Sequence, residues 1–124
     1  MVEPQSLISV VDDDESIRKS LPGLLKEFGF AAQVFRSAEE FLVSDSVTKT
    51  KCLILDNAMP GMDGPELHRE LKRRRLAVPV IFITGHRDEA VRSRMLEDGA
   101  VECLFKPFSD TALLEALNKA VSDK

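Results

Sequence analysis

The sequence predicts an α/β domain in which five strands of one parallel sheet alternate with five helices. Its 124 residues suit one domain, and its 44% hydrophobic and 31% charged residues are typical of globular proteins. Short apolar runs also alternate strictly with helical patterns along the chain. Such an alternation favours right-handed crossovers with helices on both faces of the sheet. We therefore expect a doubly wound, three-layer (βα)5 domain that occupies residues 1–124.

Five apolar runs are the expected strands, and each precedes a helical pattern. They cover residues 7–11, 32–35, 52–55, 80–84 and 102–105. Strands of a covered parallel sheet are apolar throughout, and these runs nearly are. In an open sheet of this kind, ligands bind beyond the carboxyl ends of the strands. The residues that follow each strand are therefore the first candidates for a site.

The first two helices have different local signals. The first has an apolar face that begins at Ile17, but Pro22 and Gly23 lie inside it and should kink or weaken it. The second begins with Ser37 and Glu40, whose spacing predicts a capping box.

The last three helices are marked mainly at their ends. The third should begin at Gly64–Pro65 and end in the basic run 72–75, which we interpret as a solvated helix end. His68, in the middle of this helix, is expected on the surface. The fourth should close at Gly99, and the fifth should follow Ser109.

Charge and terminal patterns limit the compartment and the partners. The net charge of −4 argues against a protein that binds nucleic acid through bulk charge. The first residues lack the basic start and apolar run of an export signal, and the longest apolar stretch, about 76–84, is too short to span a bilayer. We expect a cytoplasmic domain with no nucleic-acid or membrane partner. Cys52 and Cys103 lack metal or redox spacing and are expected to be buried free thiols.

Carboxylates follow two of the expected strands. Asp12 and Asp13 follow the first strand and Asp56 follows the third. If these strands are neighbours, the like charges repel unless a cation or protons intervene, and oxygen-only ligands favour Mg²⁺. A second interpretation of the run 12–15 is simple capping of the first helix, and the run alone does not decide between the two.

A hydroxyl and an ammonium join these acids at the same edge. Thr84 ends the fourth strand and Lys106 follows the fifth. Taken singly, Thr84 is better explained by a cap and Lys106 by a solvated position. Together with the acids they supply a nucleophile, metal ligands, a hydrogen-bond donor and a counter-charge, which is the set that phosphoryl transfer needs.

The motifs at these strand ends resemble those of a known family. They are Val11-Asp12-Asp13, the segment 56–64 (Asp-Asn-Ala-Met-Pro-Gly-Met-Asp-Gly), Ile83-Thr84-Gly85-His86 and Lys106-Pro107-Phe108. Over essentially its full length, the chain resembles the receiver domain of bacterial two-component response regulators. The run 83–86, with Gly99-Ala100-Val101 and 106–108, is similar to the FixJ-type subgroup. The resemblance implies a flavodoxin-like fold with strand order 2-1-3-4-5.

The resemblance also implies roles for individual residues. Asp56 would accept a phosphoryl group from the phosphohistidine of a sensor histidine kinase. Mg²⁺ would be held by Asp13, Asp56 and the backbone carbonyl of Ala58, with Asp12 acting mainly through a bound water.

Thr84 would then hydrogen-bond the phosphoryl group, and Lys106 would pair with one of its oxygens. Asp14 would cap a helix, and the Lys106–Pro107 peptide would be cis.

Signal output is where the chain departs from the family pattern. Cys103 stands three positions before Lys106, where receivers usually carry an aromatic side chain that changes rotamer. The switch residues would be Thr84 and Cys103, with the read-out left open at Cys103. The resemblance implies a change of the face formed by the fourth helix, fifth strand and fifth helix. It also implies phosphorylation-promoted homodimers and a C-terminal helix-turn-helix output domain outside this chain.

Three other functions compete with the phosphoacceptor receiver. A phosphatase with an aspartate nucleophile would place a second Asp two residues after Asp56, where this chain has Ala58. A flavodoxin-like cofactor binder would need a phosphate-cradling loop in place of the acidic run 12–14. An adaptor receiver that works without phosphorylation is the third. We expect self-phosphorylation and slow autodephosphorylation, and no turnover enzyme.

Overall fold

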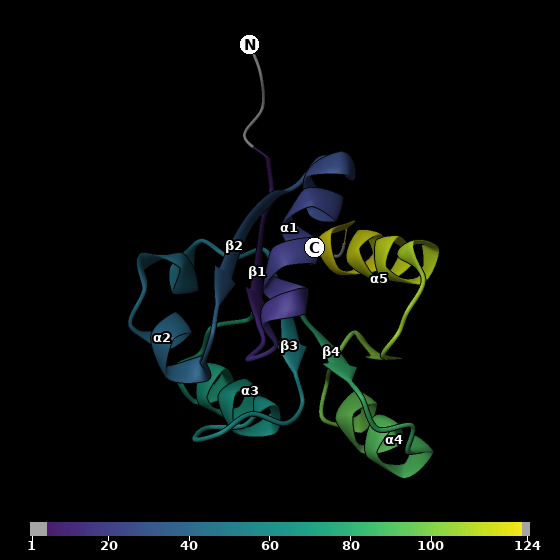
Figure 1. The fold of residues 1–124 in the computed structure, drawn as a ribbon. Coiled ribbons are helices and arrows are strands. Elements are labelled where there is room, and N and C mark those ends of the chain that lie inside the picture. Colours follow the sequence, from purple (N-terminus) through teal and green to yellow (C-terminus); the bar gives the residue numbers. More distant parts are fainter. Residues whose placement is uncertain (1–4, 123–124) are drawn as a thin grey trace.

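A computed structural model describes residues 5–122 and shows one five-stranded sheet. All neighbouring strands are parallel, in the order β2-β1-β3-β4-β5. Helices follow the strands in turn, as Figure 1 shows. The predicted fold class and strand order are thus confirmed.

The element bounds lie close to the expected ones. The strands are β1 (Leu7–Val11), β2 (Ala31–Phe35), β3 (Cys52–Asp56), β4 (Val80–Thr84) and β5 (Glu102–Phe105). The helices are α1 (Glu15–Glu27), α2 (Ala38–Leu42), α3 (Gly64–Arg73), α4 (Glu89–Glu97) and α5 (Asp110–Ser122), with a short 3₁₀ helix η1 at Asp45–Thr48. β3 includes Asp56, so the carboxylate belongs to the last residue of the strand.

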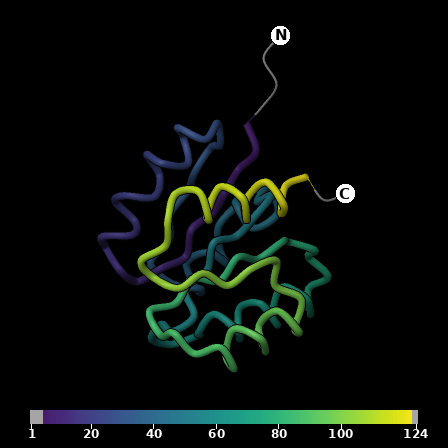
Figure 2. The backbone as a smooth tube through the Cα atoms, turned by 90° about the vertical axis from the view of Figure 1, so that its right-hand side faces the viewer, coloured from purple at the N-terminus to yellow at the C-terminus, as the bar shows by residue number. Residues whose placement is uncertain are grey.

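Two separate hydrophobic cores fill the spaces on the two faces of the sheet. One lies beneath α2, α3 and α4 and contains Phe41, Leu67 and Phe82. The other lies beneath α1 and α5 and contains Leu25 and Leu117. Figure 2 shows α5 on one side of the sheet and α3 with α4 on the other. Alternate strand residues belong to different cores, so the domain has the three layers that the sequence predicts.

Polar side chains cap the starts of several helices. Asp14 caps α1, and its carboxylate accepts from the backbone N–H of Ser16 at 2.8 Å. Asp63 and Glu66 form a reciprocal capping box at α3. α1 continues through Pro22 without a break, and its apolar face packs on the sheet.

The second helix differs in detail from the expectation. The hydroxyl of Ser37 accepts from the backbone N–H of Glu40 at 3.0 Å, which is half of the predicted capping box. The carboxylate of Glu40 instead accepts from the backbone N–H of Arg36 at 3.0 Å, one residue before the cap. The helix ends at Leu42, and η1 fills the remaining distance to β3.

Two predictions about single residues have different outcomes. Cys52 and Cys103 are both buried free thiols, as expected, and they lie in different cores on opposite faces of the sheet. The expectation that His68 lies on the surface is wrong. Its side chain is 6% exposed, and its ring packs edge-on to Phe82 with 5.6 Å between ring centroids. The face of α3 that bears Leu67 and Leu71 is wide enough to include it.

No helix within residues 5–122 is long and apolar enough to cross a membrane.

The start of α3 lies unusually close to the end of β3. A Cβ placed on Gly64 would lie 2.4 Å from the backbone oxygen of Asp56 and 3.0 Å from the Phe82 ring. The backbone N–H of Gly64 donates to the carbonyl of Asn57 at 3.1 Å. Only glycine allows this approach, which fixes the loop that follows Asp56.

We expect Gly64→Ala to lower the free energy of unfolding by about 1–3 kcal/mol, because the added methyl meets backbone that cannot move aside freely. Urea denaturation checks this value. Gly23→Ala is the matched control: its Cβ would meet nothing within 4 Å. It should raise stability by roughly 0.5–1 kcal/mol, as expected in a helix interior. A Gly64→Ala protein as stable as wild type would contradict the close approach.

Candidate functional site

The carboxyl ends of β1 and β3 bring three carboxylates together. In the register of these neighbouring strands Val11 lies opposite Leu55, so Asp12 and Asp56 follow side by side. Carboxylate oxygens of Asp12, Asp13 and Asp56 lie within 4.8 Å of one another. Asp12 and Asp56 are buried, at 0% and 6% exposure, while Asp13 is exposed. The structure therefore assembles the acidic pocket from the residues that the sequence singled out.

One ammonium group offsets part of this negative charge. The Nζ of Lys106 lies 3.0 Å from Oδ2 of Asp12 and 3.6 Å from Oδ1 of Asp56. Lys106 follows β5, and its backbone N–H donates to the carbonyl of Thr84 at 2.8 Å. The Lys106–Pro107 peptide is cis. One cation thus faces two buried acids.

Asp12 is held by backbone and side-chain contacts on several sides. Its Oδ1 accepts from the backbone N–H of Asp14 at 2.8 Å, and its backbone carbonyl accepts from Arg18 at 3.0 Å. Its Oδ2 is buried and, within residues 5–122, has the Lys106 contact but no hydrogen bond of good geometry. A buried carboxylate oxygen without a hydrogen bond is suited to a further polar partner, such as a metal-bound water.

Burial and the neighbouring acids change the proton affinity of Asp56. Burial, and then the charge of Asp12, raise its pKa to about 7, although Lys106 acts in the opposite direction. For Lys106, burial would lower the pKa, but Asp12 and Asp56 outweigh burial and raise it. Without a further cation, Asp56 is therefore partly protonated near neutral pH, whereas Lys106 stays charged.

The donor set fits a magnesium ion. Three carboxylates of this cluster can offer oxygen ligands, and one of them is exposed and can exchange with water. Mg²⁺ prefers oxygen ligands and retains several waters. A divalent cation here would also remove the repulsion that raises the pKa of Asp56.

The remaining predicted residues lie around this cluster. Thr84 is the last residue of β4 and is buried, and its Oγ1 accepts from the backbone N–H of His86 at 3.2 Å. Ala58 is exposed in the loop after β3. Asn57 anchors that loop by donating from its backbone N–H to the carbonyl of Ile83 at 3.0 Å.

Cys103 lies on β5, and its backbone carbonyl is contacted by Arg92, a residue that the sequence analysis did not single out. The guanidinium of Arg92, on α4, donates to the Cys103 carbonyl at 3.2 Å and to the Glu102 carboxylate at 2.7 Å. Burial raises the pKa of the Cys103 thiol, although Arg92 acts in the opposite direction. A packed thiol therefore explains Cys103 better than a reactive thiolate. No local sequence pattern indicates the Arg92 contacts, which depend on how α4 lies on β5.

Comparison with known proteins agrees with this geometry. A family model described as the response regulator receiver domain matches residues 8–118. Nodulation protein W of Bradyrhizobium diazoefficiens is 42% identical over 113 residues, which cover 91% of this chain and 50% of that protein. Transcriptional regulatory protein FixJ of Rhizobium meliloti is 40% identical over 113 residues, which cover 91% of this chain and 55% of that protein. The chain therefore spans about half the length of these curated relatives.

Solved structures share the fold. A crystal structure described as FixJ-N has a TM-score of 0.85 at 36% identity, covering 100% of this chain and 98% of that one. A structure of the response regulator StyR has a TM-score of 0.87 at 39% identity, covering 95% of this chain and 60% of that one. With the sheet order, the acidic cluster and the matched family model, these likenesses show that the chain belongs to the response regulator receiver domain family and resembles its FixJ-type members.

Proposed function

We propose that residues 1–124 act as a receiver domain in which Asp56 accepts a phosphoryl group from the phosphohistidine of a sensor histidine kinase. The observation that supports this most directly is the position of Asp56 at the end of β3. It lies beside Asp12 and Asp13, with the Lys106 ammonium 3.6 Å away. A carboxylate oxygen of Asp56 attacks phosphorus, the P–N bond to the donor histidine breaks, and the imidazole leaves with the bonding electron pair.

The acidic cluster supports the metal requirement of this reaction. Asp13, Asp56 and the backbone carbonyl of Ala58 would hold Mg²⁺, with Asp12 acting through a bound water. When bound, the ion neutralises charge that develops on the phosphoryl oxygens. The chain's own contribution is to hold Asp12 in place, through the N–H of Asp14 and the side chain of Arg18.

Thr84 and Lys106 would carry the signal away from Asp56. Each can contact a phosphoryl oxygen, Thr84 through its hydroxyl and Lys106 through its ammonium. Lys106 now pairs with the two buried acids, so a phosphoryl group on Asp56 would compete for it. A shift of Thr84 or Lys106 would change the positions of β4, β5 and α4.

Cys103 would take part in this switch without acting as a swinging ring. Its side chain is buried in the core beneath α4. The Arg92 contacts to Glu102 and to the Cys103 carbonyl hold α4 against β5. We propose that α4 moves by rearranging these contacts, and that the face formed by α4, β5 and α5 then promotes homodimerisation.

The relatives suggest a wider context. Because the curated relatives are about twice as long, we propose that this domain works with an output domain, of helix-turn-helix type, outside this chain. A cytoplasmic transcription regulator phosphorylated by a sensor kinase fits the description of FixJ as a transcriptional regulatory protein. The phosphatase alternative is weaker because Ala58 stands where a general acid would be needed.

The phosphoacceptor role predicts the outcome of one substitution. Incubation with acetyl phosphate and Mg²⁺ should add one phosphoryl group to the wild type and none to Asp56→Asn, because the amide is a poor nucleophile. Intact-mass spectrometry measures both. Asp14→Asn is the matched control: asparagine caps a helix about as well as aspartate, so phosphorylation should persist. An adduct on Asp56→Asn, or none on wild type, would sink the assignment of Asp56.

The raised pKa of Asp56 predicts a pH dependence of stability without metal. Its pKa moves from 3.8 to about 7 on folding. The folded state therefore binds more protons than the unfolded state between these values, and stability falls as pH rises from about 4 to about 7. At pH 8 in EDTA, Asp56→Asn should be more stable than wild type by on the order of 2–4 kcal/mol, and this difference should shrink at pH 4.

Urea denaturation at the two pH values measures the difference, and wild type with excess Mg²⁺ is the control. Binding of Mg²⁺ to the acids should restore stability at pH 8. A difference between the variants that is the same at both pH values would show that Asp56 is not the group responsible.

Lys106→Ala separates phosphorylation from its read-out. We expect phosphorylation of Asp56 to survive, since the nucleophile remains, but phosphorylation should no longer promote the dimer because the ammonium that follows the phosphoryl group is absent. Sedimentation velocity with and without acetyl phosphate measures the dimer. Lys26→Ala, which removes an exposed lysine in the last turn of α1, outside the face formed by α4, β5 and α5, is the control. Dimerisation of Lys106→Ala equal to that of wild type would refute this role.

A further inference from the structure

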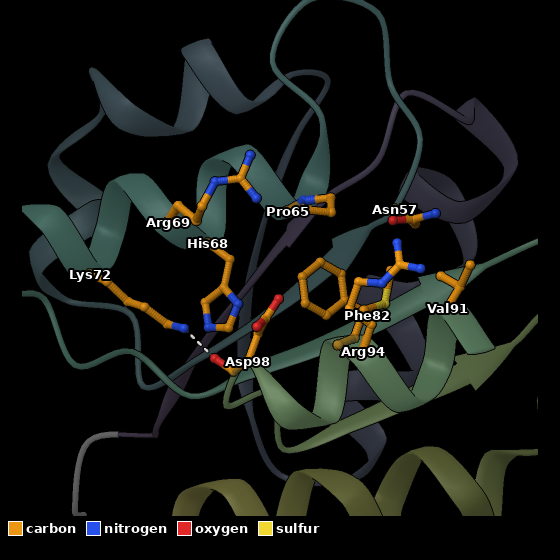
Figure 3. A pocket seen from close by; sticks show the side chains of 10 residues that line it. Asn57, Pro65, His68, Arg69, Lys72, Phe82, Val91, Arg94 and Asp98 are labelled. Atoms are coloured by element: carbon orange, nitrogen blue, oxygen red, sulfur yellow. Dashed lines mark hydrogen bonds between the residues drawn. The ribbon is translucent and has the colours of Figure 1, made fainter. Parts of the chain in front are cut away.

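A pocket lies between α3 and α4, outside the acidic cluster. Its volume is about 280 Å³, near the lower end of the size range of small-molecule sites, roughly 300–1,000 Å³. Phe82 of β4 lines it together with apolar side chains of both helices. Figure 3 shows His68 and Arg69 from α3 and Arg94 from α4 around this hollow, with Phe82 between the helices. Asp12, Asp13 and Lys106 do not line it.

His68 places an imidazole ring at the wall of this pocket. Its side chain is only 6% exposed, and no hydrogen bond to its ring occurs within residues 5–122. Burial, and then the nearby charge of Lys72, lower its pKa, so the ring is neutral near pH 7 and carries one N–H donor. Within residues 5–122, only Oδ2 of Asp12 is a fully buried side-chain polar atom without a hydrogen bond, so water can reach the His68 ring. A molecule in the pocket could take the place of that water and accept the hydrogen bond.

The charges around the pocket favour an anion. Three of its lining residues are cationic (Arg69, Lys72, Arg94), and one, Asp98, is a carboxylate. Lys72 donates to the backbone carbonyl of Asp98. Arg69 and Arg94 have no ion pair in the described part of the chain.

The neighbouring arginines of α3 behave differently. Arg73 and Arg74 both pair with Glu70, at 2.6 and 2.7 Å. Beside the pocket, by contrast, each helix contributes one guanidinium group that has no ion pair within residues 5–122, Arg69 from α3 and Arg94 from α4. A guanidinium binds carboxylate or phosphonate oxygens in a bidentate manner.

We infer that the α3–α4 pocket binds a small organic anion whose apolar, preferably aromatic, body lies against Phe82 and whose anionic group is held by Arg69 and Arg94. His68 would donate the orienting hydrogen bond. Binding of this anion is separate from the proposed phosphoacceptor function and does not depend on it. The pocket is lined by Asn57, which follows Asp56, and by residues of α3 and α4. The ligand would therefore bridge the two helices next to the phosphorylation site.

Phenylphosphonate is a suitable probe because it joins a phenyl ring to a phosphonate and cannot transfer a phosphoryl group. The chain contains two histidines, His68 and His86, so their ring signals in a ¹H–¹³C NMR titration report on two separate places. In EDTA, without Mg²⁺, the His68 signals should shift in a saturable way, with a dissociation constant on the order of 1 mM for so small a ligand. The His86 signals should stay in place.

Inorganic phosphate, without an apolar body, and benzyl alcohol, without charge, should both bind at least several-fold more weakly. Saturable binding of inorganic phosphate with the same affinity would overturn the proposal, since the apolar floor would then contribute nothing. A titration that leaves the His68 signals unchanged would overturn it as well.

Substitutions at exposed positions test the charges without threatening the fold. The double variant Arg69→Gln with Arg94→Gln should bind phenylphosphonate roughly tenfold more weakly, as expected for the loss of charge-assisted hydrogen bonds. Arg75→Gln is the matched control, because Arg75 is exposed at the end of the same segment and does not line the pocket. Asp98→Asn should tighten binding by removing the opposing carboxylate.

Asp56→Asn should bind the probe as wild type does, which separates this site from the acidic cluster. Equal weakening by Arg75→Gln and by the double variant would reduce the effect to overall charge and contradict a built pocket. Loss of binding in Asp56→Asn would place the probe at the acidic cluster and also contradict the proposal.

Discussion

The repulsion between buried carboxylates at the end of β1 and β3 is the constraint on which the rest of the site depends. Asp12 and Asp56 are nearly inaccessible to water, and Asp13 lies beside them. In a low-dielectric setting such charges are tolerated only with a counter-charge, a proton or a cation. Lys106 supplies one positive charge for three carboxylates. Because the acids still lack sufficient positive charge, the site is suited to a divalent ion.

The scaffold around the acids holds them in this unfavourable arrangement. Asp12 is fixed through the backbone of Asp14 and by Arg18, both of them at or near the start of α1. On the other strand, Gly64 lets α3 begin directly against the backbone of Asp56. The cores on both faces of the sheet stabilise these positions. The stability of the fold therefore offsets the unfavourable repulsion among these acids. When a phosphoryl group adds its charge to theirs, the same charges can drive a conformational change.

Much of the fold could be predicted from the sequence because alternating apolar runs and helical patterns admit few topologies. The gathering of Asp12, Asp56, Thr84 and Lys106 at one edge follows from the same alternation. What could not be predicted depends on how elements meet in space. The burial of His68 depends on the packing of its ring against Phe82 of β4, and the Arg92–Glu102 pair depends on the placement of α4 beside β5. Local patterns contain no such information.

The proton balance of magnesium binding tests the central claim most directly. If burial and the neighbouring acids hold the pKa of Asp56 at about 7, the carboxyl is about half protonated at pH 7, and an ion that binds it must displace that proton. Isothermal titration calorimetry in two buffers of different ionisation enthalpy measures the protons released. We expect release of about half a proton per Mg²⁺ at pH 7, almost none at pH 8.5, and none in Asp56→Asn at either pH. Magnesium binding at pH 7 without proton release would contradict the account.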